Sequence, residues 1–144
     1  MAVNKLDRKE SKVEFDATYY KVFMDAELLV EHHFGAKGDK LQEKAIFIKT
    51  MSERVLKIAS DIGTHIRIAN SIYPQCIQEA RERRVHQDKA IGLCFDLLTK
   101  YQNIMVILKI PDDKYVTEIR NLIHEINCIK KWRESDNKRF HAVG

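Results

Sequence analysis

Histidine and cysteine are the residues in this chain whose chemistry could support a metal site or a nucleophile. The six histidines stand at positions 32, 33, 65, 86, 124 and 141. A metal site carried by one helix needs two ligands three or four residues apart on the same face, and no two of these histidines have that spacing. The E-x-x-H motif of di-metal helical bundles is also missing from the sequence. We therefore expect no bound metal, and we interpret His65 as a polar residue at the edge of the core.

The three cysteines give equally little support for catalysis. Cys76, Cys94 and Cys128 are an odd number, and their spacing fits neither a disulfide framework nor a zinc site. Cys94 lies between Leu93 and Phe95 and lacks the electropositive, exposed setting that stabilises a thiolate. The stretch GAKGDK is too short for a phosphate-binding loop, and the G-x-S-x-G, H-E-x-x-H and CxxC motifs are absent from the sequence. We expect a protein that is not an enzyme and holds no cofactor.

Basic residues are the third group whose chemistry could define a function, because they bind phosphates. They gather near three expected helix ends, as Arg67, Arg81, Arg83, Arg84, Lys130, Lys131, Arg133, Lys138 and Arg139. Acidic residues among them stand at 79, 82, 134 and 136, so nine positive and four negative charges leave +5, above the +4 of the whole chain. Trp132 stands between two of these bases and could stack on a nucleobase, although a lone tryptophan in a helix more often belongs to a core or an interface.

The elements that must position these residues are helices. Five glycines and two prolines are few for this length, and the breaks at Gly35 and Gly38, at Pro74 and at Pro111 divide the chain into four segments. In each segment apolar residues recur at alternating spacings of three and four, which is the period of an amphipathic helix. The recurring residues are Phe15, Tyr19, Val22, Ala26, Leu29 and His33, then Leu41, Ala45, Ile48, Ser52, Val55, Ile58, Ile62, His65 or Ile66 and Ala69, then Ile91, Cys94, Leu98, Tyr101, Met105 and Leu108, and finally Tyr115, Ile119, Leu122, Ile126 and Ile129.

Four long helices with short connections predict an all-α fold, an up-down-up-down four-helix bundle. We expect a polar, frayed lead-in over residues 1–13, the bundle over 14–137 and a short basic tail over 138–144. The apolar seam of the third helix, extended towards its start, reaches Arg84 and Gln87, so this seam becomes basic at one end.

Single residues give finer expectations about helix ends and contacts. Asp112 follows Pro111 and is a plausible N-cap, and Asp39 or Gly38 would begin the second helix. Gly63 and Gly92 fall inside predicted helices, where each costs up to about 1 kcal/mol relative to alanine. We interpret both glycines as positions of close helix contact.

Alternating helix directions would bring the basic clusters together. The start of the third helix would lie beside the ends of the second and the fourth, and the clusters would form one basic surface that binds a polyanion. In the alternative interpretation each cluster is an ordinary solvated helix end, and the basic run over residues 130–139 simply complements the helix macrodipole. The protein would then be a structural or adaptor bundle with no role in nucleic-acid binding.

Length and composition predict one soluble domain. A chain of 144 residues with 44% hydrophobic and 32% charged residues is typical of a globular protein with a single core. No uninterrupted apolar run approaches the roughly 18 to 20 residues that span a bilayer, and the N-terminal MAVNKLDRKESK lacks the apolar centre of a signal peptide. We expect a cytoplasmic protein with no membrane partner.

One stretch resembles a known family. The sequence YVTEIRNLIHEINCIKKW, residues 115–132, resembles the closing helix of the accessory variability determinant proteins of diversity-generating retroelements, which belong with the four-helix proteins encoded by intervening sequences of large-subunit ribosomal RNA. The family pattern is a tyrosine, a helical run and then E-I-G-x-x-x-G-G-W, and this chain matches it at Tyr115, Glu125, Ile126 and Trp132, with one residue fewer between Ile126 and Trp132 than the pattern has. Upstream, the pair at 69–70 matches the A-N pair of the family, and the resemblance covers roughly residues 19 to 133.

The chain also departs from the family pattern. Asn127, Lys130 and Lys131 stand where the family has glycines, so the close contacts that those glycines permit are altered here. The A-N pair is followed by Ser-Ile-Tyr-Pro in place of an arginine-bearing stretch, and the arginines follow later in the chain.

The resemblance implies a non-enzymatic, barrel-like homopentamer whose basic surface binds nucleic acid. Template RNA is the expected ligand, with DNA as a second one, and the reverse transcriptase of the element is the implied partner in mutagenic copying. A ring of subunits would also cover apolar residues that stand off the four seams. These residues are Phe23, Phe47, Leu56, Ile68, Leu93 and Ile107, and a wide core stripe would account for them equally well.

Overall fold

The computed structural model describes the backbone of residues 5–140 and the side chains of residues 17–140. Within that range the regular structure is entirely helical, without a strand, so the predicted all-α class is confirmed. The α-helices are α1 Lys5–Glu31, α2 Asp39–Glu43, α3 Ala45–Ser71, α4 Ile77–Leu108 and α5 Val116–Arg139, and two short 3-10 helices are η1 His33–Gly35 and η2 Asp112–Tyr115.

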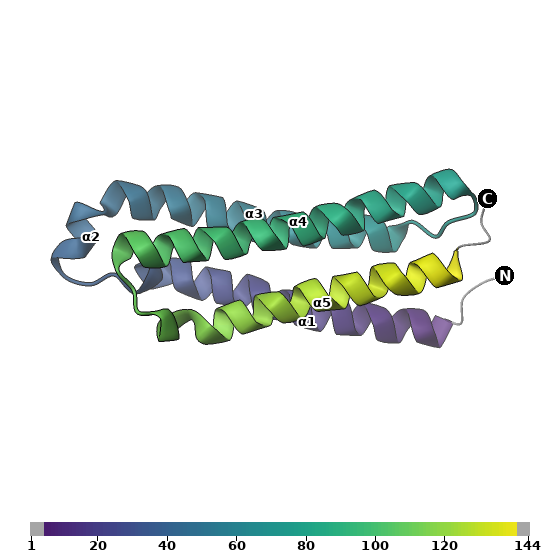
Figure 1. The fold of residues 1–144 in the computed structure, drawn as a ribbon, viewed down its shortest axis with the longest axis horizontal. Coiled ribbons are helices and arrows are strands. Elements are labelled where there is room, and N and C mark those ends of the chain that lie inside the picture. The colour runs from purple at the N-terminus through teal and green to yellow at the C-terminus, as the bar shows by residue number, and fades with distance from the viewer. Residues whose placement is uncertain (1–4, 141–144) are drawn as a thin grey trace.

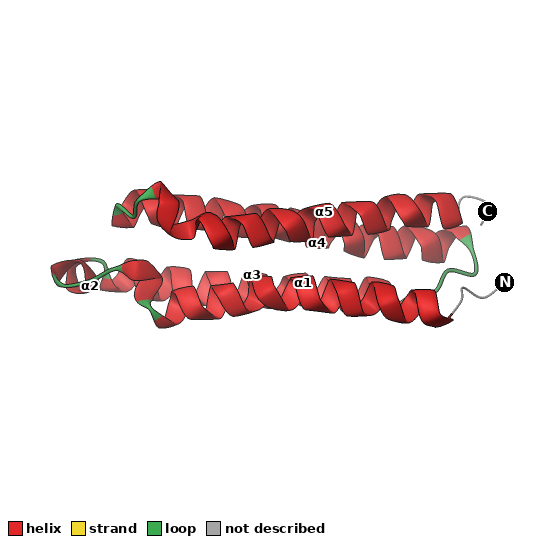
Figure 2. Cartoon of the chain, turned by 90° about the horizontal axis from the view of Figure 1, so that it is seen from below, coloured by secondary structure: helices red, strands yellow, loops and turns green. Residues whose placement is uncertain are grey.

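The four long helices lie side by side along the length of the molecule (Figure 1). Seen at right angles to that view, α4 and α5 form one layer and α1 and α3 form the other (Figure 2). Each long helix packs against two others, because α3 contacts α4 and α1, while α5 contacts α4 and α1. The start of α4, the end of α3 and the end of α5 therefore meet at one end of the molecule, on the right in Figure 1.

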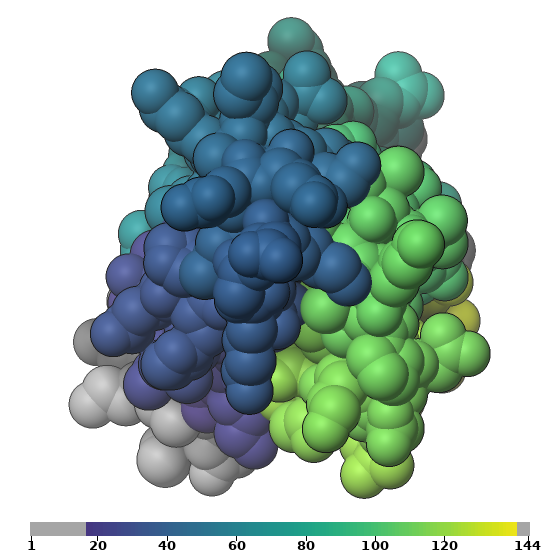
Figure 3. Space-filling view, turned by 90° about the vertical axis from the view of Figure 1, so that its left-hand side faces the viewer, coloured from purple at the N-terminus to yellow at the C-terminus, as the bar shows by residue number. Residues whose placement is uncertain are grey.

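The opposite end carries the remaining connections. The space-filling view in Figure 3 shows the segment around α2 beside the segment that joins α4 to α5. The Lys40 ammonium donates a hydrogen bond to the Leu108 carbonyl across this junction, and the Tyr115 hydroxyl donates one to the Phe34 carbonyl at 2.5 Å. Phe34 itself has a left-handed backbone, with φ 58°, and its side chain is fully buried.

The predicted breaks are confirmed, and a helix begins at Asp39 with Gly38 at its N-cap position as expected, but the expected lead-in, tail and Asp112 N-cap need correction. The long helices are interrupted around Gly35 to Gly38, around Pro74 and at Pro111. Helix α1 begins at Lys5, so most of the expected lead-in over residues 1–13 is helical, and α5 continues to Arg139 inside the expected tail. The predicted N-cap at Asp112 is wrong, because Asp112 is the first residue of η2 and the N-cap position of α5 is occupied by Tyr115.

The apolar seams are buried largely as predicted, with one systematic shift. In α3 the buried residues include Ile48, Val55, Ile62 and Ala69. In α4 the buried residues are Leu97 and Ile104, where the seam predicted Leu98 and Met105. At the start of the helix Arg83 is buried, where the seam predicted Arg84. Phe15 of the first seam lies outside the residues whose side chains are described, and His33, the last residue of that seam, is exposed.

The two helical glycines differ in their surroundings. A Cβ atom at Gly63 would lie 2.4 Å from the hydroxyl oxygen of Tyr19, so the expected close contact is confirmed there. The Tyr19 hydroxyl donates a hydrogen bond to the Ala59 carbonyl at 2.8 Å, and burial raises the pKa of Tyr19 to about 12. At Gly92 the prediction is wrong, because among the described residues no other helix or side chain comes within 4 Å of an added Cβ.

Helix α4 combines great length with an apolar segment. By length and composition alone it could cross a membrane, and it is the one such helix in the described part of the chain. Only 33% of that segment is buried inside the molecule, and a core helix of a soluble protein satisfies the same two criteria. A single helix of this kind is weak evidence for a membrane span.

Candidate nucleic-acid interface

A buried ion pair joins the start of α4 to the end of α5. The Arg83 guanidinium donates to both carboxylate oxygens of Asp136, at 2.6 and 3.1 Å, and to the Ile72 carbonyl at 2.8 Å. The Gln87 amide donates to Asp136 at 2.6 Å. All three residues are at least 93% buried. A charged pair withdrawn from water needs such additional hydrogen bonds to offset desolvation, and this cluster fixes how α3, α4 and α5 meet.

One expectation about this end is therefore corrected, and one of two interpretations of Trp132 is decided. Arg83 was predicted on the binding surface, but its side chain lies inside the molecule with Asp136 as its counter-ion. Trp132 was a candidate for stacking on a base, but it is only 8% exposed and its ring lies 5.0 Å from the Arg83 guanidinium. The tryptophan therefore has the core position that is more common for a lone helical tryptophan.

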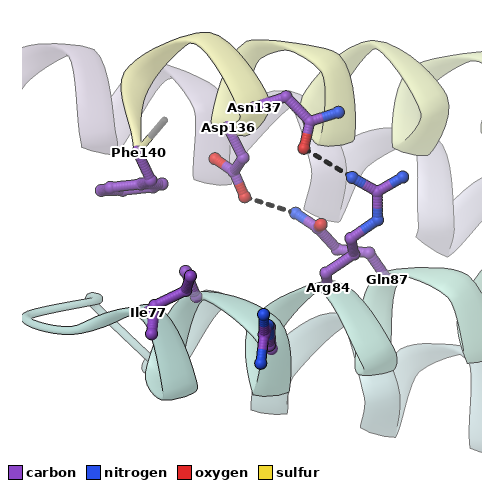
Figure 4. A pocket seen from close by; sticks show the side chains of 8 residues that line it. Ile77, Arg84, Gln87, Asp136, Asn137 and Phe140 are labelled. Carbon is purple, nitrogen blue, oxygen red and sulfur yellow. Dashed lines mark hydrogen bonds between the residues drawn. The ribbon is translucent and has the colours of Figure 1, made fainter. Parts of the chain in front are cut away.

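Above this cluster lies a pocket of about 260 Å³ between the first turns of α4 and the last turn of α5. Figure 4 shows Ile77, Arg84 and Gln87 on α4, facing Asp136, Asn137 and Phe140 on the α5 side. Arg84 lines the pocket, and its guanidinium donates a hydrogen bond to the Asn137 side-chain oxygen at 2.7 Å (Figure 4). Arg81 also lines the pocket and is exposed, and residues 17–140 offer it no ion-pair partner.

The other basic residues of α5 lie along its outer sides. Lys130 is half-buried, with its ammonium 5.5 Å from the centre of the Phe95 ring. Arg133 is paired with Asp88 of α4 at 2.8 Å. Over residues 130–139 of this helix, the exposed basic residues are Lys131, Lys138 and Arg139.

Arg67 stands apart from this group. It lies on α3, and its guanidinium donates a hydrogen bond to the Tyr20 hydroxyl of α1 at 3.0 Å. The nine predicted residues thus do not share one face: Arg81 and Arg84 flank the pocket between α4 and α5, Arg67 lies in the layer of α1 and α3, and Arg83 is interior.

Sequence reasoning missed a pair of histidines that face each other across α3 and α4. The Nδ1 atoms of His65 and His86 are 2.9 Å apart, so one ring must donate its proton to the other. Partial burial is the first cause that lowers the pKa of His65, followed by the positive charges of His86 and Lys89. The two residues are 21 positions apart in the chain, so no local spacing could have revealed the pair.

The described residues bring one thiol next to an imidazole, since Cys128 Sγ lies 3.6 Å from His124 Nε2 on α5, but they form no cluster that could hold a metal. Among residues 17–140 no set of three or more histidine, cysteine, aspartate or glutamate side chains has the geometry of a metal site. Cys94 is fully buried, and that burial raises the pKa of its thiol. Glu125, one of the landmarks of the family resemblance, is fully buried and accepts a hydrogen bond from Thr18 at 3.2 Å.

Comparison with protein-family models, with curated proteins and with solved structures found no match to this chain.

Proposed function

We propose that this protein is a non-enzymatic accessory protein of a diversity-generating retroelement, which binds nucleic acid through its basic end and supports mutagenic reverse transcription. The observation that carries the proposal is the pair of exposed guanidinium groups, Arg81 and Arg84, held beside a pocket by the buried Arg83–Asp136 pair. Exposed arginines on a rigid base suit phosphate binding, because little conformational freedom is lost when the contact forms. Template RNA is the proposed ligand, with DNA as a second one.

The proposal includes the assembly that the family resemblance implies. The chain would form an up-down-up-down four-helix bundle, five copies would close a ring in the cytoplasm, and the ring would bind the reverse transcriptase of the same element. Apolar side chains on the surface support contact between copies. Met24 is 57% exposed, Ile46 84% and Val106 74%, and contact between copies would withdraw these apolar side chains from water.

Charge reversal tests nucleic-acid binding. The variant Arg81→Glu/Arg84→Glu/Lys131→Glu changes three exposed residues at the basic end, while Lys37→Glu/Lys49→Glu/Lys114→Glu changes three exposed residues near the other end by the same net charge. The first variant should bind RNA at least about ten-fold more weakly, with a salt dependence shallower by about 0.7 in log–log slope for each phosphate contact removed. The control variant should bind almost as the wild type does. Equal binding by the two variants would refute a specific basic end.

A structural or adaptor role is the second candidate, and one observation favours it. Four of the predicted binding residues already have partners within the chain: Arg67 with Tyr20, Arg83 with Asp136, Arg84 with Asn137, and Arg133 with Asp88. Failure of the wild-type protein to bind single-stranded or duplex RNA even at low salt would support this role and exclude the nucleic-acid proposal.

A further inference from the structure

We propose that the pocket between the start of α4 and the end of α5 binds one unpaired base of a single-stranded nucleic acid, with the adjoining phosphates on Arg81 and Arg84. This inference rests on the proposed function and specifies the ligand of the same basic end. Basic residues alone would bind the phosphates of any duplex. The pocket adds apolar walls and a hydrogen-bonding group, and these are the chemistry that a base requires.

The walls of the pocket match the flat faces of a base. Ile77 and Ala80 line it from the first turn of α4, and Phe140 lines it from the residue that follows α5. Figure 4 shows the Phe140 ring nearly edge-on across from Ile77, so that a ring face is turned towards Ile77. An edge-to-face contact with Tyr73, at 5.7 Å between ring centres, holds this ring. Bases stack on such aromatic rings with little dependence on sequence.

The polar groups of the pocket divide into a fixed floor and an available edge. Gln87 and Asp136 are bonded to each other at 2.6 Å, so they hold the shape of the floor. Asn137 is exposed and accepts a hydrogen bond from Arg84 at its oxygen. Its amide nitrogen keeps two N–H donors, for which residues 17–140 supply no acceptor. These donors suit the carbonyl oxygens and ring nitrogens at the edge of a base.

The size of the pocket selects for an unpaired base. Its volume of about 260 Å³ lies just below the roughly 300 to 1,000 Å³ of pockets that hold drug-sized ligands, which suits one planar ring system. A base within a duplex has its faces stacked and its pairing edge occupied, so it reaches a recess only when it is splayed out. The protein should therefore prefer single strands to duplexes. RNA and single-stranded DNA offer the same chemistry to these residues.

The test measures binding of the full-length protein to an unstructured single strand of RNA, to the matching DNA strand, and to a duplex of equal length at equal salt. Ala80→Leu fills the pocket without changing charge, and Phe140→Leu removes the aromatic ring. Ala45→Leu, at an exposed position that begins α3, is the matched control. Circular dichroism and a thermal melt verify that each variant is folded.

The expected result is tighter binding of single strands than of duplex by the wild type and by Ala45→Leu. Ala80→Leu should lose this preference, while Phe140→Leu should weaken single-strand binding by about five-fold or more. Neither pocket variant should alter duplex binding. A preference that survives Ala80→Leu would overturn the pocket inference and leave the basic-end function in place. Absence of binding to every probe by the wild type would overturn the proposed function as well. Tighter binding of the RNA strand than of the DNA strand would identify RNA as the source of the base.

Discussion

Removing the negative charge of Asp136 should destabilise the whole molecule, although the residue is far from the centre of the core. The Asp136→Asn substitution keeps the size of the side chain but leaves the Arg83 guanidinium without a counter-ion. The side chains of these two residues are 7% and 9% exposed, so bulk water reaches neither one freely. Loss of one partner from a buried ion pair typically costs about 3 to 5 kcal/mol.

The substituted asparagine can still accept one hydrogen bond, so the expected loss lies near about 3 kcal/mol. With a urea m-value of about 1 to 3 kcal/mol/M, the unfolding midpoint should fall by about 1 to 3 M. Asp96→Asn is the control, because Asp96 forms a 2.9 Å pair with Lys100 while 44% exposed. Exposed pairs of this kind contribute only about 0 to 1 kcal/mol.

A third variant separates loss of the pair from an uncompensated charge. Arg83→Met/Asp136→Leu removes both charges together, and replacement of a buried pair by apolar side chains is often close to neutral. The double variant should therefore be more stable than Asp136→Asn alone, even though the Ile72 carbonyl and the Gln87 amide lose partners. If Asp136→Asn changes the unfolding midpoint no more than Asp96→Asn does, the Arg83 charge is solvated in the folded state and does not depend on Asp136 as a buried counter-ion.

Three further predictions concern packing, pH and assembly. Gly63→Ala should lower the free energy of unfolding in urea by about 1 to 3 kcal/mol, because its Cβ would overlap the anchored Tyr19 ring. Gly92→Ala should raise that free energy by up to about 1 kcal/mol, because its Cβ would enter open space. Similar effects at both positions would contradict the packing difference. Because the pKa of His65 is lowered in the folded state, the unfolded chain binds protons more readily, so the stability contributed by neutral His65 is present above the ordinary histidine pKa of about 6.5 and is lost as pH falls below it. The His65→Gln/His86→Gln variant should lose less thermal stability than the wild type between neutral pH and about pH 5, and identical pH profiles would argue against the pair. Light scattering of the purified protein should give a particle of about five chains, and a monomer would remove the ring from the proposed function.

The sequence alone determined the class of the fold and most of its buried faces. Seams of period three to four identified the four long helices, and scarce glycine and proline residues marked where those helices are interrupted. This succeeded because the hydrophobic stripe of a helix depends on local spacing, which is fully visible in one chain. Short connections and alternating helix directions also predicted that the start of α4 would lie beside the ends of α3 and α5.

Only the tertiary structure decided which side chains at that end face inwards. Successive residues in a helix differ by about 100° in direction, so a shift of one position separates buried Arg83 from exposed Arg84. The seam predicted that Arg84 faces the core, because too few apolar residues precede Ile91 to define the rotation of the helix at its start. The counter-ion of Arg83 lies 53 positions further along the chain. The physical reason is that a helix takes its final rotation from the partners against which it packs, and those partners are set by the assembled fold.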